Sequence, residues 1–465
     1  MGSLKITAPF DGAEIGTLPT ADAAAVEKAL ASAYGLYRDR DAWLPKARRI
    51  EILRKAAEII KSRRQELAVA AAREGGKPLP DSLVEIDRGA DGVEGCIEEL
   101  RTRAGNVIPM GVTPSSAGRI AFTQNEPIGV VAAVSAFNHP FNLIVHQVAP
   151  AVATGCPVIV KPASATPLSC KAFLDILTEA GLPQGWAQML IPESHDLSTA
   201  FVSDPRVGFF AFIGSSKVGW MLRSKLAPGA RCALEHGGVA PVIVAGDANL
   251  DANLPRIAKG GFYHAGQVCV SVQRVFAERG IARQVAERLA GLGDAMTVGD
   301  PTLATTEVGP LISHKECQRV ADWVDEAVAG GAELVSGGAK ISESCYKPTV
   351  LFDPPADATI STNEVFGPVI CVYPYDDMDE AIDRANSLPV SFQAAVFTES
   401  LDTALRAYRR LDGTAIMVNE HTAFRVDWMP FAGARTSGHG VGGIPYTMHE
   451  MQIEKMMVLR SDQLD

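Results

Sequence analysis

The chain has 465 residues, of which 47% are hydrophobic and 21% charged, a balance that is ordinary for a globular protein of roughly two or three domains. Its formal net charge of −11 argues against a general binder of nucleic acids or anionic membranes, because both ligands require a basic surface. A small anionic ligand stays compatible with this charge, since one local Arg or Lys can hold it.

The start of the chain has no charged segment followed by an apolar run, so we expect no secretory signal. The longest apolar stretch, 128–137, is too short to cross a bilayer and predicts a buried strand. The eight cysteines form no C-x-x-C pair and have no zinc-like spacing to the nine histidines. We therefore expect no metal site, no disulfides and a reducing cytoplasm.

Two amphipathic helices are predicted near the N-terminus, over 23–37 after an N-cap within Thr20-Ala21-Asp22 and over 47–74 before Gly75-Gly76. From 127 onward, apolar strand-like runs alternate with helical stretches up to 214, which predicts parallel βαβ units. A similar alternation restarts at 240 and continues to 400, so we predict a second α/β domain.

Two further segments, 118–127 and 451–460, alternate like exposed strands and fit neither domain. Free strand edges are liabilities unless they are covered. We expect these segments to form a pairing arm, and the protein to be a homodimer or homotetramer. The alternative is that they fold back on their own chain.

Three residues are candidates for covalent chemistry. Cys269, in YHAGQVCVS, is a candidate nucleophile, although a lone Cys is most often inert core. Glu235, followed by His236 and two glycines at the end of a strand, is a candidate general base or an exposed turn carboxylate. Asn138 closes an apolar strand, where its amide can donate to an oxyanion or make a turn before Pro140.

Three other segments suit a nucleotide. Lys161 ends a buried strand, and open α/β sheets bind ligands at this edge. Gly214 and Ser215 follow a strand and open a helix, as a phosphate site requires, although this is not a G-x-G-x-x-G motif. Glu364 and Phe366 offer a carboxylate for ribose hydroxyls beside an aromatic ring.

Taken together and in this order, these segments resemble the aldehyde dehydrogenase superfamily, from 14 to 443. The resemblance implies an α/β fold with a Rossmann-type cofactor domain, an α/β catalytic domain and a small β oligomerisation arm. The implied boundaries are 1–117 and 128–235 for the cofactor domain, 236–444 for the catalytic domain, and 118–127 with 445–465 for the arm.

The resemblance also implies roles. Cys269 is the nucleophile, Asn138 and the Cys269 backbone N–H form the oxyanion hole, and Glu235 activates water. Lys161 and Glu364 hold the two riboses of NAD or NADP, while Ser215, after Gly214, faces the pyrophosphate and Phe366 packs near the nicotinamide. The implied reaction is NAD(P)-dependent oxidation of a small aldehyde to a carboxylic acid.

Departures from the family pattern bear on the cofactor. Ser164 stands where NAD-preferring members often have Glu, and Lys217 stands where Glu is common. A carboxylate would repel a 2′-phosphate, so these residues favour NADP, while NAD stays open. His236 replaces a common Leu, and Ala136-Phe137 replaces Pro-Trp.

Alignment to the family motifs predicts that Asn142, His146, Val268 and Val270 line the substrate tunnel. Arg425 is expected near its mouth, where it would clamp an anionic tail or pair with a carboxylate such as Asp427. We therefore expect a short hydroxylated or anionic aldehyde, of the lactaldehyde or semialdehyde kind. An acylating dehydrogenase and a catalytically silent binding protein on the same scaffold are the alternatives, against which Glu235 and the complete set of three residues argue.

Overall fold

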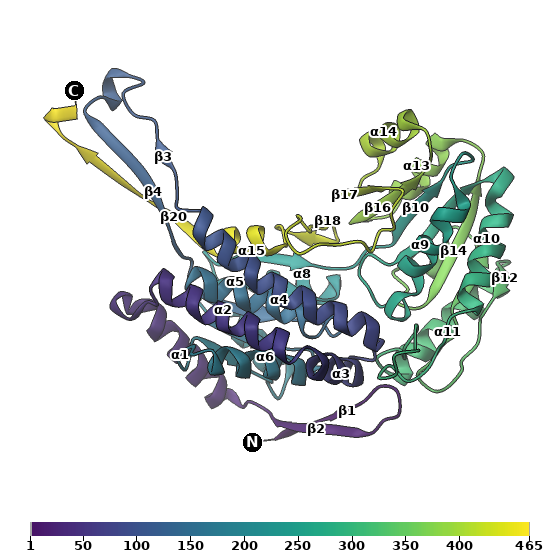
Figure 1. The fold of residues 1–465 in the computed structure, drawn as a ribbon, viewed down its shortest axis with the longest axis horizontal. Coiled ribbons are helices and arrows are strands. Elements are labelled where there is room, and N and C mark those ends of the chain that lie inside the picture. The colour runs from purple at the N-terminus through teal and green to yellow at the C-terminus, as the bar shows by residue number, and fades with distance from the viewer. Residues whose placement is uncertain (1, 465) are drawn as a thin grey trace.

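The computed structural model describes residues 2–464, which form two α/β lobes and a projecting β arm (Figure 1). The apolar runs recognised in the sequence become buried strands of two separate sheets. The predicted α/β class is therefore confirmed.

The sheet of the first lobe has six strands in the order β19-β9-β8-β5-β6-β7, all parallel except β19. Neighbouring carboxyl ends of parallel strands meet at one edge, so this order gathers the residues that follow β5, β8 and β9. The strands are β5 (Val130–Val134), β6 (Val158–Lys161), β7 (Ala187–Met189), β8 (Val207–Ile213), β9 (Arg231–Glu235) and β19 (Gly438–His439).

Helices cover both faces of this sheet. The N-cap predicted within Thr20-Ala21-Asp22 is Asp22, whose side chain accepts the Ala25 N–H at 2.9 Å. The helices are α1 (Ala23–Arg38), α2 (Lys46–Ser62), α3 (Arg64–Gly75), α4 (Leu79–Thr102), α5 (Asn142–Thr154), α6 (Pro167–Glu179), α7 (His195–Ser203) and α8 (Ser216–Arg223).

The single helix predicted over 47–74 is wrong, because the chain breaks into α2 and α3 at Arg63. Arg63 has φ −104° and ψ 17°, and its N–H is shared between the carbonyls of Ile59 and Ile60. The predicted end is correct, since α3 stops before Gly76, which adopts a left-handed φ of 77°.

The sheet of the second lobe has seven strands in the order β12-β13-β14-β11-β10-β16-β17, of which only β12 runs antiparallel to its neighbour. Its strands are β10 (Ala240–Val244), β11 (Val272–Glu278), β12 (Glu333–Ser336), β13 (Thr349–Phe352), β14 (Val369–Tyr375), β16 (Gln393–Phe397) and β17 (Ala415–Val418). The accompanying helices are α9 (Leu250–Phe262), α10 (Arg279–Asp294), α11 (His314–Ala329), α12 (Thr359–Thr362), α13 (Met378–Asn386) and α14 (Leu401–Arg410). The last helix, α15 (Ile444–Glu450), packs instead against α4 and α5 of the first lobe.

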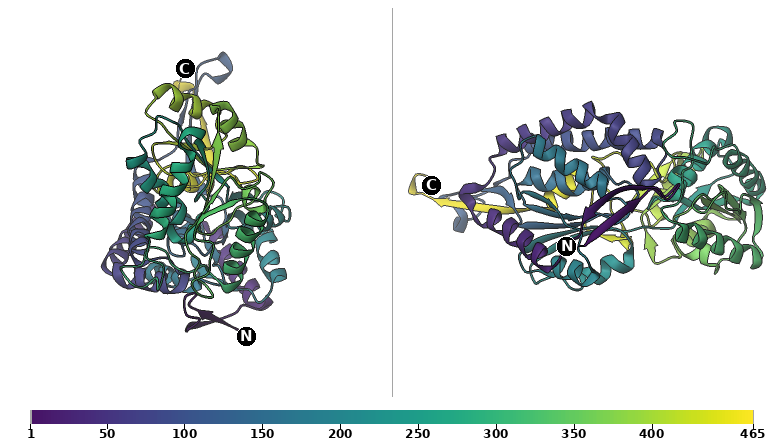
Figure 2. Two further views of the ribbon diagram at one scale, coloured as in Figure 1. Left: turned by 90° about the vertical axis from the view of Figure 1, so that its right-hand side faces the viewer. Right: turned by 90° about the horizontal axis from the view of Figure 1, so that it is seen from below.

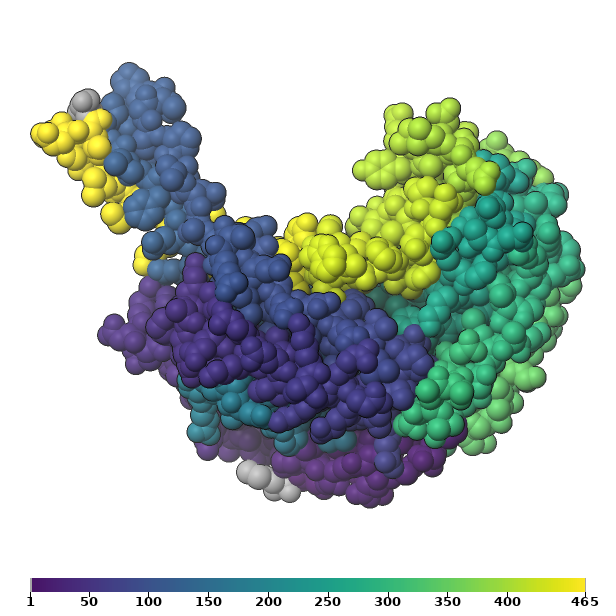
Figure 3. All heavy atoms as spheres, in the orientation of Figure 1, coloured from purple at the N-terminus to yellow at the C-terminus, as the bar shows by residue number. Residues whose placement is uncertain are grey.

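The arm is an antiparallel sheet in which β4 (Arg119–Pro127) lies between β20 (Gln452–Arg460) and β3 (Val107–Ile108). The two segments expected in an arm thus pair with each other, and β3 joins them from outside the predicted range. The arm stands clear of the body, with a broad hollow between it and the second lobe (Figures 2 and 3).

Two small antiparallel pairs complete the fold, β1 (Ser3–Thr7) with β2 (Glu14–Pro19) and β15 (Val390–Ser391) with β18 (Ala434–Arg435). No helix within residues 2–464 combines the length and apolar character needed to cross a membrane. All eight cysteines are free thiols.

Candidate active site

A cavity of about 680 Å³ lies at the carboxyl ends of β5, β8 and β9. The loop around Cys269 borders it from the second lobe. Asn138, Glu235 and Cys269, three side chains from distant parts of the sequence, all line this one cavity.

The loop before Cys269 has an unusual backbone. His264 and Ala265 adopt left-handed φ values of 50° and 53°, a conformation that costs a non-glycine residue about 1–3 kcal/mol. Gln267 holds this conformation, since its side-chain amide donates to the carbonyls of His264 and Pro310 at 3.3 and 3.2 Å. The position of the thiol is thus fixed by a buried side chain and not by loop propensity.

Hydrogen bonds tie the other two candidates to this loop. Asn138 is 6% exposed, and its Nδ2 donates to the Gln267 carbonyl at 2.9 Å. The N–H of Gly238, three residues after Glu235, donates to the Cys269 carbonyl at 3.1 Å. These two bonds place the ends of β5 and β9 against the backbone that carries the sulfur.

The electrostatics of the site follow from burial. Burial raises the pKa of the Cys269 thiol to about 12, an effect that Glu364 strengthens and Arg425 opposes. Burial also raises the pKa of Glu235, again against the Arg425 cation. Within residues 2–464 the Glu235 carboxylate accepts no hydrogen bond, and it packs so closely on Gly442 that a Cβ there would lie 2.1 Å from Oε1. The cavity therefore holds a protonated thiol and a free carboxyl group.

Four of the predicted cofactor residues, Gly214, Ser215, Glu364 and Phe366, line the same cavity. The Glu364 carboxylate lies on Gly237, where a Cβ would come within 1.9 Å of Oε1. Burial raises the pKa of Glu364 to about 8, and its Oε1 has no hydrogen-bond partner among residues 2–464.

The residues present fit a dinucleotide. Ser215 begins α8 without making a cap bond, so its hydroxyl stays available at a helix N-terminus. Lys161, the last residue of β6, and Ser164, three residues later, do not border the cavity itself, whereas Ala163 between them does. Among the described residues, the Lys161 ammonium makes one hydrogen bond, a long one at 3.5 Å to the Pro162 carbonyl.

The expected substrate residues divide into two groups. Asn142, Val268, Val270 and Arg425 line the cavity. His146 does not, which corrects the expectation that it lines the tunnel. It is 4% exposed and lies behind the wall, because its Nε2 bonds Asp427 at 2.7 Å.

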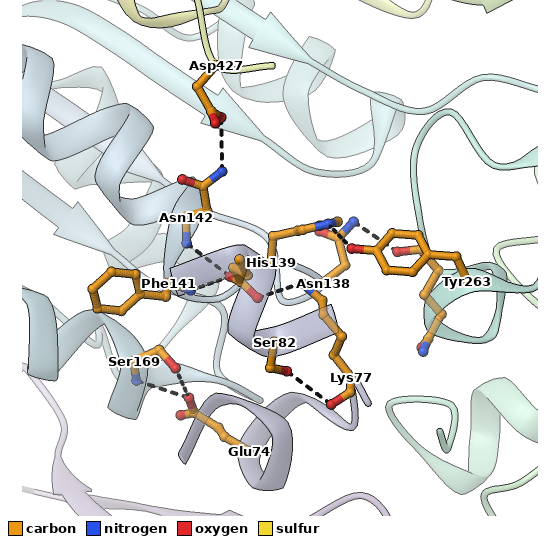
Figure 4. A network of polar contacts seen from close by, with 12 residues as sticks. Glu74, Lys77, Ser82, Asn138, His139, Phe141, Asn142, Ser169, Tyr263 and Asp427 are labelled. Atoms are coloured by element: carbon orange, nitrogen blue, oxygen red, sulfur yellow. Dashed lines mark hydrogen bonds and ion pairs between the residues drawn. The ribbon is translucent and has the colours of Figure 1, made fainter. Parts of the chain in front are cut away.

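Sequence reasoning missed several lining residues. Phe137, noted from the sequence only as a departure from the family pattern, lines the cavity and meets Phe366 edge to face, with the ring centroids 5.8 Å apart. Tyr263 pairs with His139 at 3.1 Å across the cavity wall (Figure 4). Their positions beside Asn138 and in the cysteine motif were the only signals.

The partners of Asp427 were also not predictable from the sequence. It accepts from Asn142 at 3.2 Å (Figure 4), and both of its oxygens bind the Arg88 guanidinium at 3.0 and 2.8 Å. Arg425, the partner considered from the sequence, forms no ion pair with it.

Comparison with known proteins gives this geometry a context. The model of the aldehyde dehydrogenase family matches residues 2–457. The chain belongs to the aldehyde dehydrogenase family.

Its relatives within the family share the whole architecture. A 3-sulfolactaldehyde dehydrogenase of Priestia aryabhattai is 38% identical, over 88% of this chain and 86% of the relative. The structure of aldehyde dehydrogenase 21 from Physcomitrella patens in complex with its product succinate has a TM-score of 0.94 at 32% identity, covering 99% of this chain and 95% of that one.

The structure of glyceraldehyde-3-phosphate dehydrogenase from Methanocaldococcus jannaschii, complexed with NADP, has a TM-score of 0.93 at 32% identity, covering 98% and 99%. Structures related to this aldehyde dehydrogenase are thus described with NADP or as NAD-dependent. The predicted family and the expectation of an NAD(P)-dependent enzyme are confirmed, while the preference between the two cofactors is not decided.

Proposed function

We propose that this aldehyde dehydrogenase works by covalent catalysis, with Cys269 as the nucleophile, Asn138 as an oxyanion donor and Glu235 as the general base. One observation carries the proposal. The three side chains border a single cavity with Gly214, Ser215, Glu364 and Phe366, the residues proposed to hold the cofactor.

The thiol needs a base because burial raises its pKa to about 12, so little thiolate exists at neutral pH. Glu235 is a carboxylate of the same cavity that accepts no hydrogen bond from residues 2–464, and its raised pKa improves the match between acceptor and thiol. The thiolate attacks the aldehyde carbon and forms a thiohemiacetal oxyanion.

Asn138 would stabilise that oxyanion together with the Cys269 backbone N–H. One amide hydrogen of Asn138 is used by the Gln267 carbonyl, which fixes the plane of the amide and leaves the second hydrogen to donate. Loss of one such donor commonly reduces the rate by about 10²–10³-fold.

When bound, NAD(P) supplies the hydride acceptor for oxidation of the thiohemiacetal to a thioester, which no side chain offers. The unpartnered Oε1 of Glu364 is suited to the hydroxyls of the nicotinamide ribose, and Lys161 to those of the adenosine ribose. Ser164 and Lys217 are exposed and carry no negative charge, which favours NADP.

Hydrolysis of the thioester requires an activated water. Glu235 releases the thiol proton to solvent after the first step, and it has no hydrogen-bonded partner within residues 2–464 to compete for its carboxylate, so it can then accept the proton of that water. This favours a hydrolytic reaction over transfer of the acyl group to coenzyme A, and a catalyst over a silent binding protein.

The substrate proposed is a short hydroxylated or anionic aldehyde. Three relatives are named for sulfolactaldehyde, for glyceraldehyde-3-phosphate and for a complex with succinate, and each name implies a small molecule with an anionic group. The polar wall formed by Asn142 and Arg425 agrees with this choice.

The test combines turnover with detection of the intermediate. Cys269→Ala should abolish NAD(P) reduction and leave cofactor binding, measured by calorimetry, within about twofold. Glu235→Gln removes the base of both steps, so the burst of reduced cofactor should be slower than in the unchanged enzyme, and the acyl adduct should persist once formed, visible as added mass on the peptide that contains Cys269.

Cys317→Ala serves as the matched control, because Cys317 is a buried thiol of α11 outside the cavity. Full turnover in Cys269→Ala, or loss of turnover in both thiol variants alike, would contradict the proposed mechanism.

A further inference from the structure

Arg425 is a cation in the cavity that no carboxylate neutralises. Within residues 2–464 no carboxylate oxygen lies within 4.0 Å of its guanidinium. Its contacts are the Nδ1 of His146 at 3.5 Å and the face of the Phe431 ring, 3.6 Å from the guanidinium carbon. Its Nε is buried and has no hydrogen-bond partner.

Asp427, two residues away, cannot serve as the missing counterion because its acceptor sites are filled. Oδ1 accepts from Arg88, His146 and Asn142 at 2.8, 2.7 and 3.2 Å, and Oδ2 accepts from Arg88 at 3.0 Å. Two carboxylate oxygens offer about four acceptor positions. The negative charge of Asp427 is therefore matched by Arg88.

His146 transmits this arrangement to Arg425. Burial lowers the pKa of His146, so the ring is neutral. Its Nε2–H then donates to Asp427, which leaves the lone pair of Nδ1 to face an N–H of Arg425. Arg425 is thus oriented by a neutral acceptor and an aromatic ring, which hold a guanidinium in place without cancelling its charge.

The other charges of the cavity do not change this result. Lys259 pairs with Asp81 at 2.8 Å. Glu235 and the Cys269 thiol are close enough for Arg425 to lower the pKa of both, but neither contacts the guanidinium. A part-buried cation with a free N–H, lining the same cavity as Cys269, is suited to an anion from outside the protein.

We propose that Arg425 is the anion-binding group of the substrate site, and that the enzyme takes a short aldehyde whose far end carries a carboxylate, sulfonate or phosphate. This inference rests on the proposed function, in which Cys269 attacks an aldehyde that is then oxidised. A guanidinium suits all three groups because its N–H fork matches the geometry of oxyanions. An aldehyde that carries a quaternary ammonium group is excluded by repulsion.

The first experiment measures kcat/KM for aldehydes of matched length, before and after Arg425→Gln. The pairs are succinic semialdehyde with butyraldehyde, sulfoacetaldehyde with propionaldehyde, and glyceraldehyde 3-phosphate with glyceraldehyde. A charge-assisted hydrogen bond predicts a loss of about 10- to 150-fold for the anionic member and about threefold or less for the neutral one. The anionic aldehyde with the highest kcat/KM identifies which of the three groups, carboxylate, sulfonate or phosphate, the site prefers.

The second experiment needs no turnover. It compares alkylation of Cys269 by anionic iodoacetate and by neutral iodoacetamide. Dividing the rate with iodoacetate by the rate with iodoacetamide cancels changes in thiol reactivity. This ratio should decrease about 10-fold or more in Arg425→Gln. Lys259→Gln is the matched control, since it removes a cavity cation that is already paired, and it should leave both ratios unchanged.

The two experiments separate the failure of each proposal. If neither ratio changes in Arg425→Gln, the anion site is wrong, whatever the turnover. If the alkylation ratio decreases but no aldehyde is oxidised, the anion site is supported and the proposed oxidation of aldehydes by Cys269 is wrong. Equal effects in Arg425→Gln and Lys259→Gln would show only a general field of positive charge and would also overturn the anion site.

Discussion

Gly219 and His236 form a packed pair for which structure and sequence predict opposite effects of one substitution. A Cβ at position 219 would lie 2.1 Å from Cε1 of His236 and 2.9 Å from Cδ1 of Phe212. The imidazole cannot move away easily, because its Nδ1 bonds the Gly214 carbonyl at 2.8 Å and its ring packs against Trp220 at 5.8 Å. Helix propensity alone would favour Ala over Gly by about 1 kcal/mol.

The clash should outweigh this gain, since overpacking costs about 1–3 kcal/mol. The net cost is then up to about 2 kcal/mol, so Gly219→Ala is expected to open α8 and to speed hydrogen exchange of its amides by up to about 30-fold, as measured by mass spectrometry. The cofactor Kd should rise as well, because α8 begins next to Ser215. Gly291→Ala is the matched control, since no atom lies within 4 Å of a Cβ at that helical position, and α10 should exchange more slowly.

The double variant Gly219→Ala/His236→Ala identifies the contact. Removal of the imidazole should recover at least half of the lost protection, with the remainder due to Phe212. If Gly219→Ala protects α8 as Gly291→Ala protects α10, then His236 does not constrain this helix and the reasoning is wrong.

Other predictions follow from single contacts. Ser164→Glu should raise the KM for NADP more than that for NAD, because a carboxylate repels the 2′-phosphate; equal changes would remove Ser164 from the cofactor site. The deacylation rate should fall as the pH drops through the pKa of Glu235, which burial raises, because only the ionised carboxylate accepts a proton; Arg425→Gln should move this midpoint upward in a pH series of kcat, since the cation lowers that pKa. Burial alone would raise the pKa of Asp427, but His146 and Arg88 hold that pKa well below its usual value. The ionised form therefore stabilises the protein at neutral pH, and this stability is lost on acidification. Asp427→Asn should lower the free energy of unfolding, measured in urea, by about 3–5 kcal/mol at pH 7 and by less at low pH. Deletion of 452–465 should lower the number of chains per particle, measured by light scattering, if the exposed arm pairs with a second copy. An unchanged number of chains would show that the arm lies in no interface.

The fold was predictable where one local signal dominated. The continuous apolar runs of β5, β8 and β10 can be buried only in a parallel sheet covered on both faces, so they indicated both sheets. The break at Arg63 was not predictable, because neither Gly nor Pro interrupts the helical pattern there. The left-handed backbone at His264 was equally hidden, since it is held by Gln267 through contacts with the distant residue Pro310.

The site shows the same division. Asn138, Glu235 and Cys269 were predictable because each lies in a recognisable motif and the sheet order gathers the ends of β5 and β9. The pair of Arg88 and Asp427 was not, because its members are 339 residues apart and only the packing of α4 against the C-terminal loop brings them together.

The partners of buried cations elsewhere in the chain show why the pairing of Arg88 with Asp427 matters for substrate specificity. Lys77, fully buried, has Glu85 as a carboxylate partner at 2.5 Å. Arg274, 5% exposed, has no carboxylate, but its Nη1 and Nη2 donate to carbonyls at 3.1 and 2.9 Å. Arg88 has Asp427, whereas Arg425 has only an imidazole lone pair and a ring face. Arg274 also keeps an unpartnered Nε, but Arg425 has neither a carboxylate nor a carbonyl partner among residues 2–464 and lines the cavity, so the stabilisation missing there is available for binding an anionic substrate.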